Sequence, residues 1–385
     1  MPIIKASQIW SRTDLNNPVK VAWGNIISSR PNLVAAAGNV IYLFVPAANT
    51  EYMLISATDV GAPVLSIAVG LAMTPPQYIV AGLADRVVVF GIRDGTLTRI
   101  FETEPEPGAI FIDLAIADID GDGREEVIAA SEGKQALYIY RLAEETATEI
   151  RLELLAIRLL PGPSQKVTVL DRGAGNLPLI VAAYKNNSAS GLLTLLFTER
   201  GFAEGPAEPN LPALVTSLAT GELRAQGAEE IAWGGGDGAL RIVGVNDQLT
   251  NILTSDNLGS LVPALTAGMI AGENRDTLIA GTSEGFLFGF TAPVATAVPD
   301  WAVRTGRPVY DLALNSEGLL GLGTSDGAVQ VWLLTPAGRT IHVVRPGETL
   351  YGLALRYGTT ETAIAELNRI PVAGVIYPGQ TLIIP

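Results

Sequence analysis

The stretch VIAASEGKQALYIY, residues 127–140, decides the fold of this chain. It contains two short apolar runs, rich in Val, Ile, Ala and Tyr, separated by a polar turn with a glycine. Runs of this length and composition around a tight turn predict two antiparallel β-strands. The same arrangement occurs elsewhere in the chain, at residues 33–44, 78–90, 179–197, 231–243, 278–290 and 320–333. We therefore expect a chain built from one repeated strand-pair unit.

The copies are evenly spaced. Their turns lie 42 to 58 residues apart, at Gly38, Asp85, Gly133, Gly191, Gly238, Gly285 and Gly327. Most copies contain four strand-like runs, and no sustained period of about 3.6 residues indicates helices among them. Four strands over about 40–50 residues are typical of a β-propeller blade, whereas a pair of β-sandwiches, the alternative fold, does not repeat so evenly. Seven copies predict an all-β, seven-bladed β-propeller over residues 1–338.

The last repeat is incomplete. Its strand-like runs cover residues 309–314, 319–323 and 328–334, after which the chain changes character. At the other end, Ile3 to Trp10 is a stretch that belongs to no repeat. Pairing this stretch with residues 328–334 removes an open sheet edge. We therefore expect it to be the outer strand of blade seven and to close the ring.

The composition excludes several classes of function. The 385 residues include 25 basic and 39 acidic side chains, a net charge of −14, so a nucleic-acid partner is not expected. The chain has no Cys and one His, His342, which excludes thiolate, His-cluster metal and Ser-His-Asp chemistry. The many acidic residues leave a carboxylate pair for glycoside hydrolysis open. Because sialidase-type aspartate boxes are missing as well, we predict that the protein is not an enzyme.

Export and membrane signals are missing from the sequence. The first residues, MPIIKASQIW, lack a basic segment followed by an apolar one. The long uncharged run between Arg30 and Glu51 is interrupted by Asn32, Gly38 and Pro46. A membrane-spanning helix needs about 18 continuous apolar residues, so no membrane insertion is predicted. The location stays open between the cell envelope or exterior, if the protein is exported, and the cytoplasm.

The sharpest chemical motif is DIDGDGREE, residues 118–126. Carboxylates at alternate positions of a glycine-rich loop converge on one point, and this number of hard oxygen donors suits Ca²⁺ better than a transition metal. The predicted ligands of a structural calcium ion are Asp118, Asp120, Asp122, the Arg124 carbonyl and Glu126. The twelfth position is Ala129 and not Glu, so the loop is not an EF-hand. A solvated acidic turn is the alternative interpretation.

This motif resembles the short calcium loops of FG-GAP propeller repeats. In that family the loop joins the first two strands of a blade, which implies that Ile116 and Val127 lie in the flanking strands. In blade five a cation, Arg224, stands where the central ligand would be. Blade six has Gly268 and Ile270 at ligand positions. The resemblance is therefore specific to blade three.

From Thr340 the pattern changes to strand, helix, helix and strand. Periodic apolar stretches at residues 351–357 and 362–368 predict two short helices between HVVRPGETL, residues 342–350, and VIYPGQTLIIP, residues 375–385. The whole segment, residues 340–385, resembles a LysM domain. The chain is thus expected to end in a small α+β domain of βααβ order, residues 339–385.

The resemblance implies a binding site for N-acetylglucosamine polymers such as peptidoglycan or chitin. In the LysM family a shallow groove between the first strand–helix loop and the second helix–strand loop binds them. By position, this groove comprises Gly347, Glu348, Thr349, Leu350, Ile376, Tyr377, Pro378 and Gly379. Structural roles are open for the two glycines, as turn residues, and for Leu350, as core. We expect His342 to be a surface or lightly packed strand residue.

We therefore expect a non-enzymatic binding or scaffold protein with two modules. A calcium-stabilised propeller would present a protein-interaction surface, and the LysM tail would attach it to an N-acetylglucosamine polymer such as peptidoglycan. The alternative is a structural assembly protein, for example in a phage-tail-like machine, in which both modules contact proteins. A single LysM copy should bind weakly, and oligomerisation would restore avidity.

Overall fold

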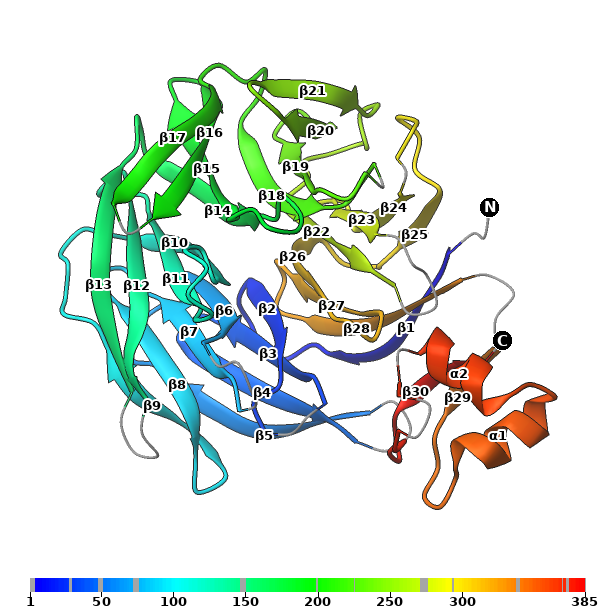
Figure 1. Ribbon diagram of the computed structural model, residues 1–385. Helices are drawn as coiled ribbons and strands as arrows, with labels where there is room; N and C mark the ends of the chain where they lie inside the picture. Colours follow the sequence, from blue (N-terminus) through cyan, green and yellow to red (C-terminus); the bar gives the residue numbers. More distant parts are fainter. Residues whose placement is uncertain are drawn as a thin grey trace.

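The computed structural model has seven four-stranded antiparallel sheets arranged around a central axis and a small domain with two helices (Figure 1). It describes residues 4–27, 30–47, 51–71, 76–145, 150–198, 200–224, 226–270, 276–292, 294–336, 340–368, 370–371 and 374–384. The predicted seven-bladed propeller is confirmed. None of the described helices is long and apolar enough to span a membrane.

Six blades consist of four consecutive strands each. Blades one to three are β2 (Val19–Gly24), β3 (Asn32–Ala37), β4 (Val40–Pro46), β5 (Tyr52–Asp59); β6 (Ser66–Gly70), β7 (Tyr78–Gly82), β8 (Val87–Arg93), β9 (Thr96–Glu102); β10 (Phe111–Ala117), β11 (Glu126–Ser131), β12 (Ala136–Glu145), β13 (Ile150–Leu159). Blades four to six are β14 (Ser164–Leu170), β15 (Leu179–Asn186), β16 (Ala189–Thr198), β17 (Gly201–Glu208); β18 (Val215–Gly221), β19 (Glu230–Gly235), β20 (Leu240–Val245), β21 (Leu249–Thr254); β22 (Ala264–Met269), β23 (Asp276–Gly281), β24 (Phe286–Thr291), β25 (Trp301–Arg304).

Blade seven combines both ends of the propeller. It consists of β26 (Val309–Leu314), β27 (Leu319–Thr324), β28 (Val329–Pro336) and, as its outer strand, β1 (Ile4–Arg12). β1 runs antiparallel to β28, with Ile4 opposite Pro336 and Arg12 opposite Val329. The predicted closure of the ring is therefore confirmed for the described residues, and Ile3 lies outside them.

Seven apolar clusters fill the spaces between neighbouring blades. The second strands are buried along their length, and small residues there let adjacent sheets approach closely. A Cβ added to Gly323 would lie 1.9 Å from the Val19 carbonyl oxygen, and one added to Gly281 would lie 2.4 Å from Val309 Cγ1. Small side chains at these positions are thus a requirement of packing around the axis.

Polar side chains also join successive blades. A carboxylate or amide at the start of a second strand accepts a hydrogen bond of 2.6–2.8 Å from the backbone N–H that follows the first strand of the preceding blade. The acceptor–donor pairs are Gln77–Asn25, Glu125–Leu71, Glu229–Asp171 and Asp276–Glu222. Three of these four acceptors are carboxylates, so part of the acidic excess pairs with backbone N–H groups between blades.

The C-terminal domain consists of β29 (Thr340–Val343), α1 (Leu350–Tyr357), α2 (Glu361–Leu367) and β30 (Thr381–Ile384), with β29 antiparallel to β30. Thr349 and Thr360 cap the two helices, each accepting a hydrogen bond from a backbone N–H of the first turn. Gly358 ends α1 in the left-handed conformation, with φ of 67°. The predicted βααβ order is confirmed.

Candidate binding sites

The loop of residues 118–125 joins β10 to β11, and Ile116 pairs with Val127 across its base. The Asp118 carboxylate accepts hydrogen bonds from the N–H groups of Gly121, at 2.7 Å, and Gly123, at 2.9 Å. Both glycines have positive φ, 79° and 85°, which favours glycine at these positions. The sequence thus folds the loop back on its own first carboxylate.

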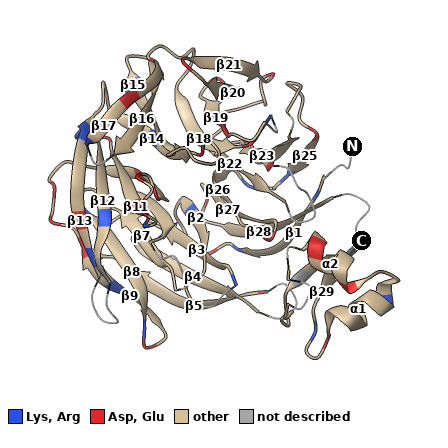
Figure 2. Ribbon diagram, in the orientation of Figure 1, with Lys and Arg blue, Asp and Glu red and all other residues tan. Residues whose placement is uncertain are grey.

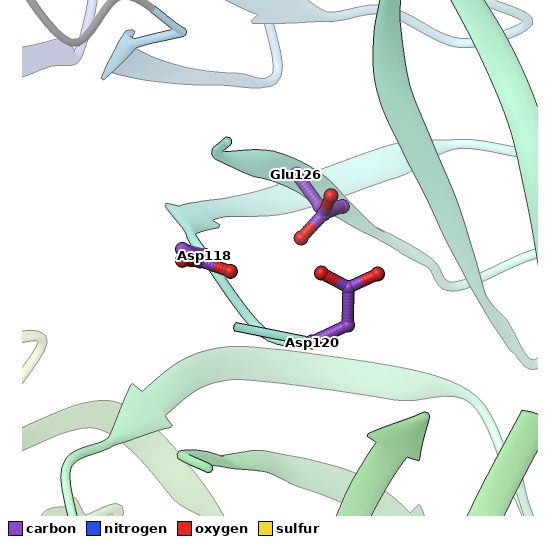
Figure 3. Close-up of side chains that lie close together, drawn as sticks. All are labelled: Asp118, Asp120 and Glu126. Atoms are coloured by element: carbon purple, nitrogen blue, oxygen red, sulfur yellow. The ribbon is translucent and has the colours of Figure 1, made fainter. Parts of the chain in front are cut away.

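Three carboxylates meet inside this loop (Figure 3). Asp118, Asp120 and Glu126 each contribute an oxygen, and these oxygens lie within 4.8 Å of one another. Glu126 is fully buried at the start of β11. The Asp122 carboxylate turns to the N–H of Arg124, at 2.8 Å, and is not part of this group. The structure thus gathers three of the five predicted calcium ligands.

Arg141 was not among the predicted site residues, although it lies at the centre of this cluster's interactions. It stands on β12 directly opposite Glu126, and its Nε donates to Glu126 Oε1 at 2.8 Å. Its Nη2 donates to Asp120 and its Nη1 lies 3.6 Å from Asp122 Oδ2. The sequence signal was weak because the cation is 15 residues downstream of Glu126 and the two meet only through strand register.

Arg141 offsets part of the negative charge of the cluster. Burial raises the pKa of Glu126, while hydrogen bonds from Arg141 and from the N–H of Ile119 act in the opposite direction. Blade five has the same framework, in which buried Glu230 accepts from the N–H of Leu223 at 2.9 Å and from Arg224 Nε at 2.7 Å. In both blades a buried Glu pairs with an Arg, and among the described residues a group of three close carboxylates is found only in blade three.

In the C-terminal domain, backbone hydrogen bonds bring together the two loops of the predicted groove. The N–H of Gly379 donates to the Val344 carbonyl at 2.7 Å, and the N–H of Val344 donates to the Gln380 carbonyl at 2.8 Å. Tyr377 is 47% exposed beside this junction. Gly347 has open space where a Cβ would lie. The two loops thus meet, and the Tyr377 ring stays accessible beside them.

Two of the predicted groove residues belong to the core. The prediction places Leu350 and Ile376 in the groove, but both are buried, in one apolar cluster with Leu353 and Ile364. The reason is that α1 and the second loop pack their apolar side chains inward against α2. Packing is therefore the role of Leu350 and Ile376, and Thr349 acts as the N-cap of α1.

The Glu348 carboxylate is hydrogen-bonded to three neighbouring residues. Its carboxylate bonds His342 Nε2 at 2.6 Å, the N–H of Arg345 at 2.8 Å and Arg356 Nη1 at 2.7 Å. Desolvation opposes its ionisation, but these donors lower the pKa of Glu348 to about 2. His342 also bonds the Tyr357 hydroxyl at 2.9 Å and is buried, so the expectation of a surface or lightly packed histidine is wrong. The network holds the first loop against α1.

The propeller contacts the second loop of this domain. Arg30, in the connection between β2 and β3, lies 3.5 Å from the Pro378 carbonyl oxygen and 3.4 Å from that of Gly379 through its Nη atoms. These two carbonyls belong to the predicted groove. Part of its polar backbone therefore already faces a cation of blade one.

Comparison with known proteins identifies the C-terminal domain, because the LysM domain family matches residues 342–385. These residues are a LysM domain. The search of curated protein sequences gave no match. Among solved structures, a chain of the crystal structure of BBS1N in complex with ARL6DN, soaked with mercury, is similar with a TM-score of 0.64 and 12% identity over 87% of this chain and 98% of that chain. At that identity the likeness concerns the fold alone.

Proposed function

We propose that this is a non-enzymatic two-module binding protein. Its LysM domain would attach the chain to an N-acetylglucosamine polymer such as peptidoglycan, and the propeller would present a surface to a protein partner. The LysM domain, with the exposed ring of Tyr377 and the open turn at Gly347, is the observation that carries this proposal. Basic and acidic positions are interspersed along the described strands of the propeller (Figure 2), which favours a protein partner over a polyanion.

The chemistry of the exposed groups supports a sugar ligand. The face of a tyrosine ring packs against the apolar face of a pyranose, and free backbone N–H and C=O groups can pair with an N-acetyl group. The site is shallow and its carboxylate, Glu348, is already saturated, so contacts must accumulate over several sugar units. A single copy would be weak, and oligomerisation of the chain would add avidity.

Retention on purified peptidoglycan tests the proposal. The full chain should be retained, whereas a chain that ends at Gly338 should not. Tyr377→Ala should weaken binding about threefold to tenfold through loss of the aromatic contact. Leu355→Ala, at a 66% exposed position of α1 outside the predicted groove, is the matched control and should bind normally. Failure of the full chain to bind peptidoglycan and chitin would overturn the glycan proposal.

We also propose a structural calcium ion in blade three. The oxygens of Asp118, Asp120 and Glu126 are close enough to share one ion, and Asp122 and the Arg124 carbonyl would complete an oxygen cage after a local rotation. Arg141 forms ion pairs with Asp120, Asp122 and Glu126, so calcium would compete with its guanidinium. Titration calorimetry of the chelator-treated chain should give one site that Asp120→Asn abolishes and Glu222→Gln, in the corresponding loop of blade five, leaves intact.

A second candidate function has one observation in its favour. The contact of Arg30 with the Pro378 and Gly379 carbonyls is a protein contact made by a loop of the predicted sugar groove. In an assembly protein, both modules would contact proteins in this way. Loss of peptidoglycan and chitin binding, together with tighter self-association or partner binding that depends on the LysM domain, would favour this candidate.

A further inference from the structure

The second loop of the LysM domain bonds most of its backbone groups within its own domain. The N–H of Tyr377 donates to Gln380 Oε1 at 3.0 Å, and the N–H of Gln380 donates to the Tyr377 carbonyl at 2.9 Å. The N–H of Gly379 and the carbonyl of Gln380 both bond Val344, which follows β29. These groups keep the loop in shape and are engaged before any ligand arrives.

The carbonyls of Pro378 and Gly379 bond outside the domain. Proline has no N–H, so these two oxygens are the remaining backbone polar groups of residues 377–380. Arg30 Nη1 donates to the Pro378 carbonyl at 3.5 Å, and its Nη2 donates to the Gly379 carbonyl at 3.4 Å. In the described part of the chain, one propeller side chain thus takes both carbonyls that the LysM domain itself leaves unbonded.

The propeller surrounds Arg30 with groups of two blades. Burial raises the pKa of Glu317, in the turn between β26 and β27 of blade seven, and the positive charge of Arg30 acts in the opposite direction. Arg30 acts in the same way on Tyr52 at the start of β5, whose pKa burial also raises. The guanidinium therefore lies where blades one and seven meet, between a carboxylate of the propeller and two carbonyls of the LysM domain.

The contact is weak by geometry but is favoured by the short connection between the domains. Both N···O distances exceed the common range of about 2.7–3.2 Å for N–H···O bonds. Three residues, 337–339, separate the end of β28 from the start of β29. So short a connection gives the two surfaces a high effective concentration, and a weak contact then suffices to hold them together. A ligand of modest affinity can compete with such a contact.

A sugar ligand needs the same oxygens. N-acetylglucosamine carries an amide N–H and hydroxyl groups, which pair with carbonyl oxygens. Because the other backbone groups of residues 377–380 are bonded within the domain, the Pro378 and Gly379 carbonyls are the acceptors that this loop offers to a ligand. Arg30 donates to these oxygens and stands where a sugar donor would have to lie.

We propose that Arg30 is an autoinhibitory latch, which holds the second loop of the LysM domain against the propeller, and that an N-acetylglucosamine polymer binds once this contact opens. This inference rests on the proposed glycan function and concerns its regulation. The docked state and the sugar-bound state exclude each other, so polymer binding releases the LysM domain from the propeller as strongly as docking weakens polymer binding. Docking lowers the apparent affinity, because only the undocked fraction of the chains is competent to bind.

Titration calorimetry of the full chain with the tetramer of N-acetylglucosamine tests the latch. Arg30→Met keeps an apolar stem and removes every donor, so this variant should bind about threefold to tenfold more tightly than the wild type. Arg151→Met, at an exposed position of β13 in blade three, is the matched control and should bind like the wild type. Melting curves show whether each variant folds.

The outcomes separate the latch from the glycan function. Equal affinities of Arg30→Met and the wild type overturn the latch and leave the glycan function standing. Weaker binding by Arg30→Met also overturns it, since Arg30 would then contribute to the sugar site. If neither the wild type nor Arg30→Met binds the tetramer, the glycan function fails and the latch fails with it.

A distance measurement tests the latch on a chain that keeps Arg30. The protein has no Cys, so Met53→Cys on β5 and Leu355→Cys on α1, at positions that are 54% and 66% exposed, provide two sites for spin labels. Pulsed electron resonance then reports the distance between blade one and the LysM domain. Saturating tetramer should shift or broaden this distance distribution, and Arg30→Met should do the same without sugar. A distribution that the bound tetramer leaves unchanged contradicts the latch.

Discussion

Replacing Arg141 by leucine should destabilise the propeller in a way that calcium reverses. Arg141 forms ion pairs with three carboxylates, whose side chains are 0% exposed in Glu126, 10% in Asp120 and 38% in Asp122. Removal of one partner from a fully buried pair costs about 3–5 kcal/mol. Because the Arg141 side chain is itself 24% exposed, water screens part of the charge, and we expect a loss near the lower limit, about 3 kcal/mol at pH 7 with chelator present.

Calcium should restore much of this loss, since it would replace the missing positive charge. Binding to the folded state adds about 2.7 kcal/mol at a hundredfold excess over Kd. Arg224→Leu in blade five is the matched control, because it also leaves a buried glutamate, Glu230, without its arginine. Among the described residues, Glu230 belongs to no group of three close carboxylates, so calcium should not rescue this variant.

The loss of stability caused by Arg141→Leu should depend on pH. Burial already raises the pKa of Glu126, and loss of Arg141 raises it further. A carboxyl group with a raised folded-state pKa stabilises the fold while it is protonated, and this contribution is lost as the pH rises above the unfolded-state value. The penalty of Arg141→Leu should therefore shrink as the pH falls toward the ordinary glutamate value of 4.5.

Urea denaturation followed by tryptophan fluorescence, in EGTA and in CaCl₂, measures these differences for the wild type and both variants. A loss below about 1 kcal/mol for Arg141→Leu in EGTA would refute the charge-compensation argument. Equal responses of Arg141→Leu and Arg224→Leu to calcium would refute the assignment of the metal to blade three.

Three further predictions concern closure, sugar length and the LysM domain. Deletion of residues 1–11 should expose the edge of β28 and cause aggregation or a large fall in melting temperature, and unchanged melting and solubility would contradict the closure argument. In a titration of the full chain, the tetramer of N-acetylglucosamine should bind far more tightly than the monomer, with a Kd of about 10 μM to 1 mM, and equal affinities would contradict an open groove. Because the pKa of Glu348 is lowered to about 2, its contribution to stability is present above pH 4.5 and is lost between pH 4.5 and 2. Glu348→Gln should remove this acid-dependent loss of stability, which the amide signals of α1 would report.

The architecture could be predicted because its determinants are local and repeated. Each copy, such as residues 127–140, carries its own strand pattern and turn, and seven copies at a steady spacing leave few folds to consider. Even the long-range pairing of β1 with β28 could be predicted from local patterns. The last repeat contains only three strands and the N-terminal apolar stretch belongs to no repeat, so pairing the two completes a four-stranded blade. The LysM domain was equally predictable, because its loops and helices are contiguous in the chain.

The candidate sites were only partly predictable, because they depend on residues that are far apart in the chain. The DIDGDGREE motif placed Asp118, Asp120 and Glu126 together because one loop carries all three, but Arg141 reaches them from another strand. Side-chain type likewise did not show that Leu350 would be buried, since burial depends on which face of α1 packs inward. The strands, the repeat and the domain order follow from the sequence alone, because they depend on neighbouring residues. Which polar groups meet follows from the three-dimensional fold, because sheet register and ring closure bring together residues far apart in the chain, such as Arg141 with Glu126 and Val21 with Asp311.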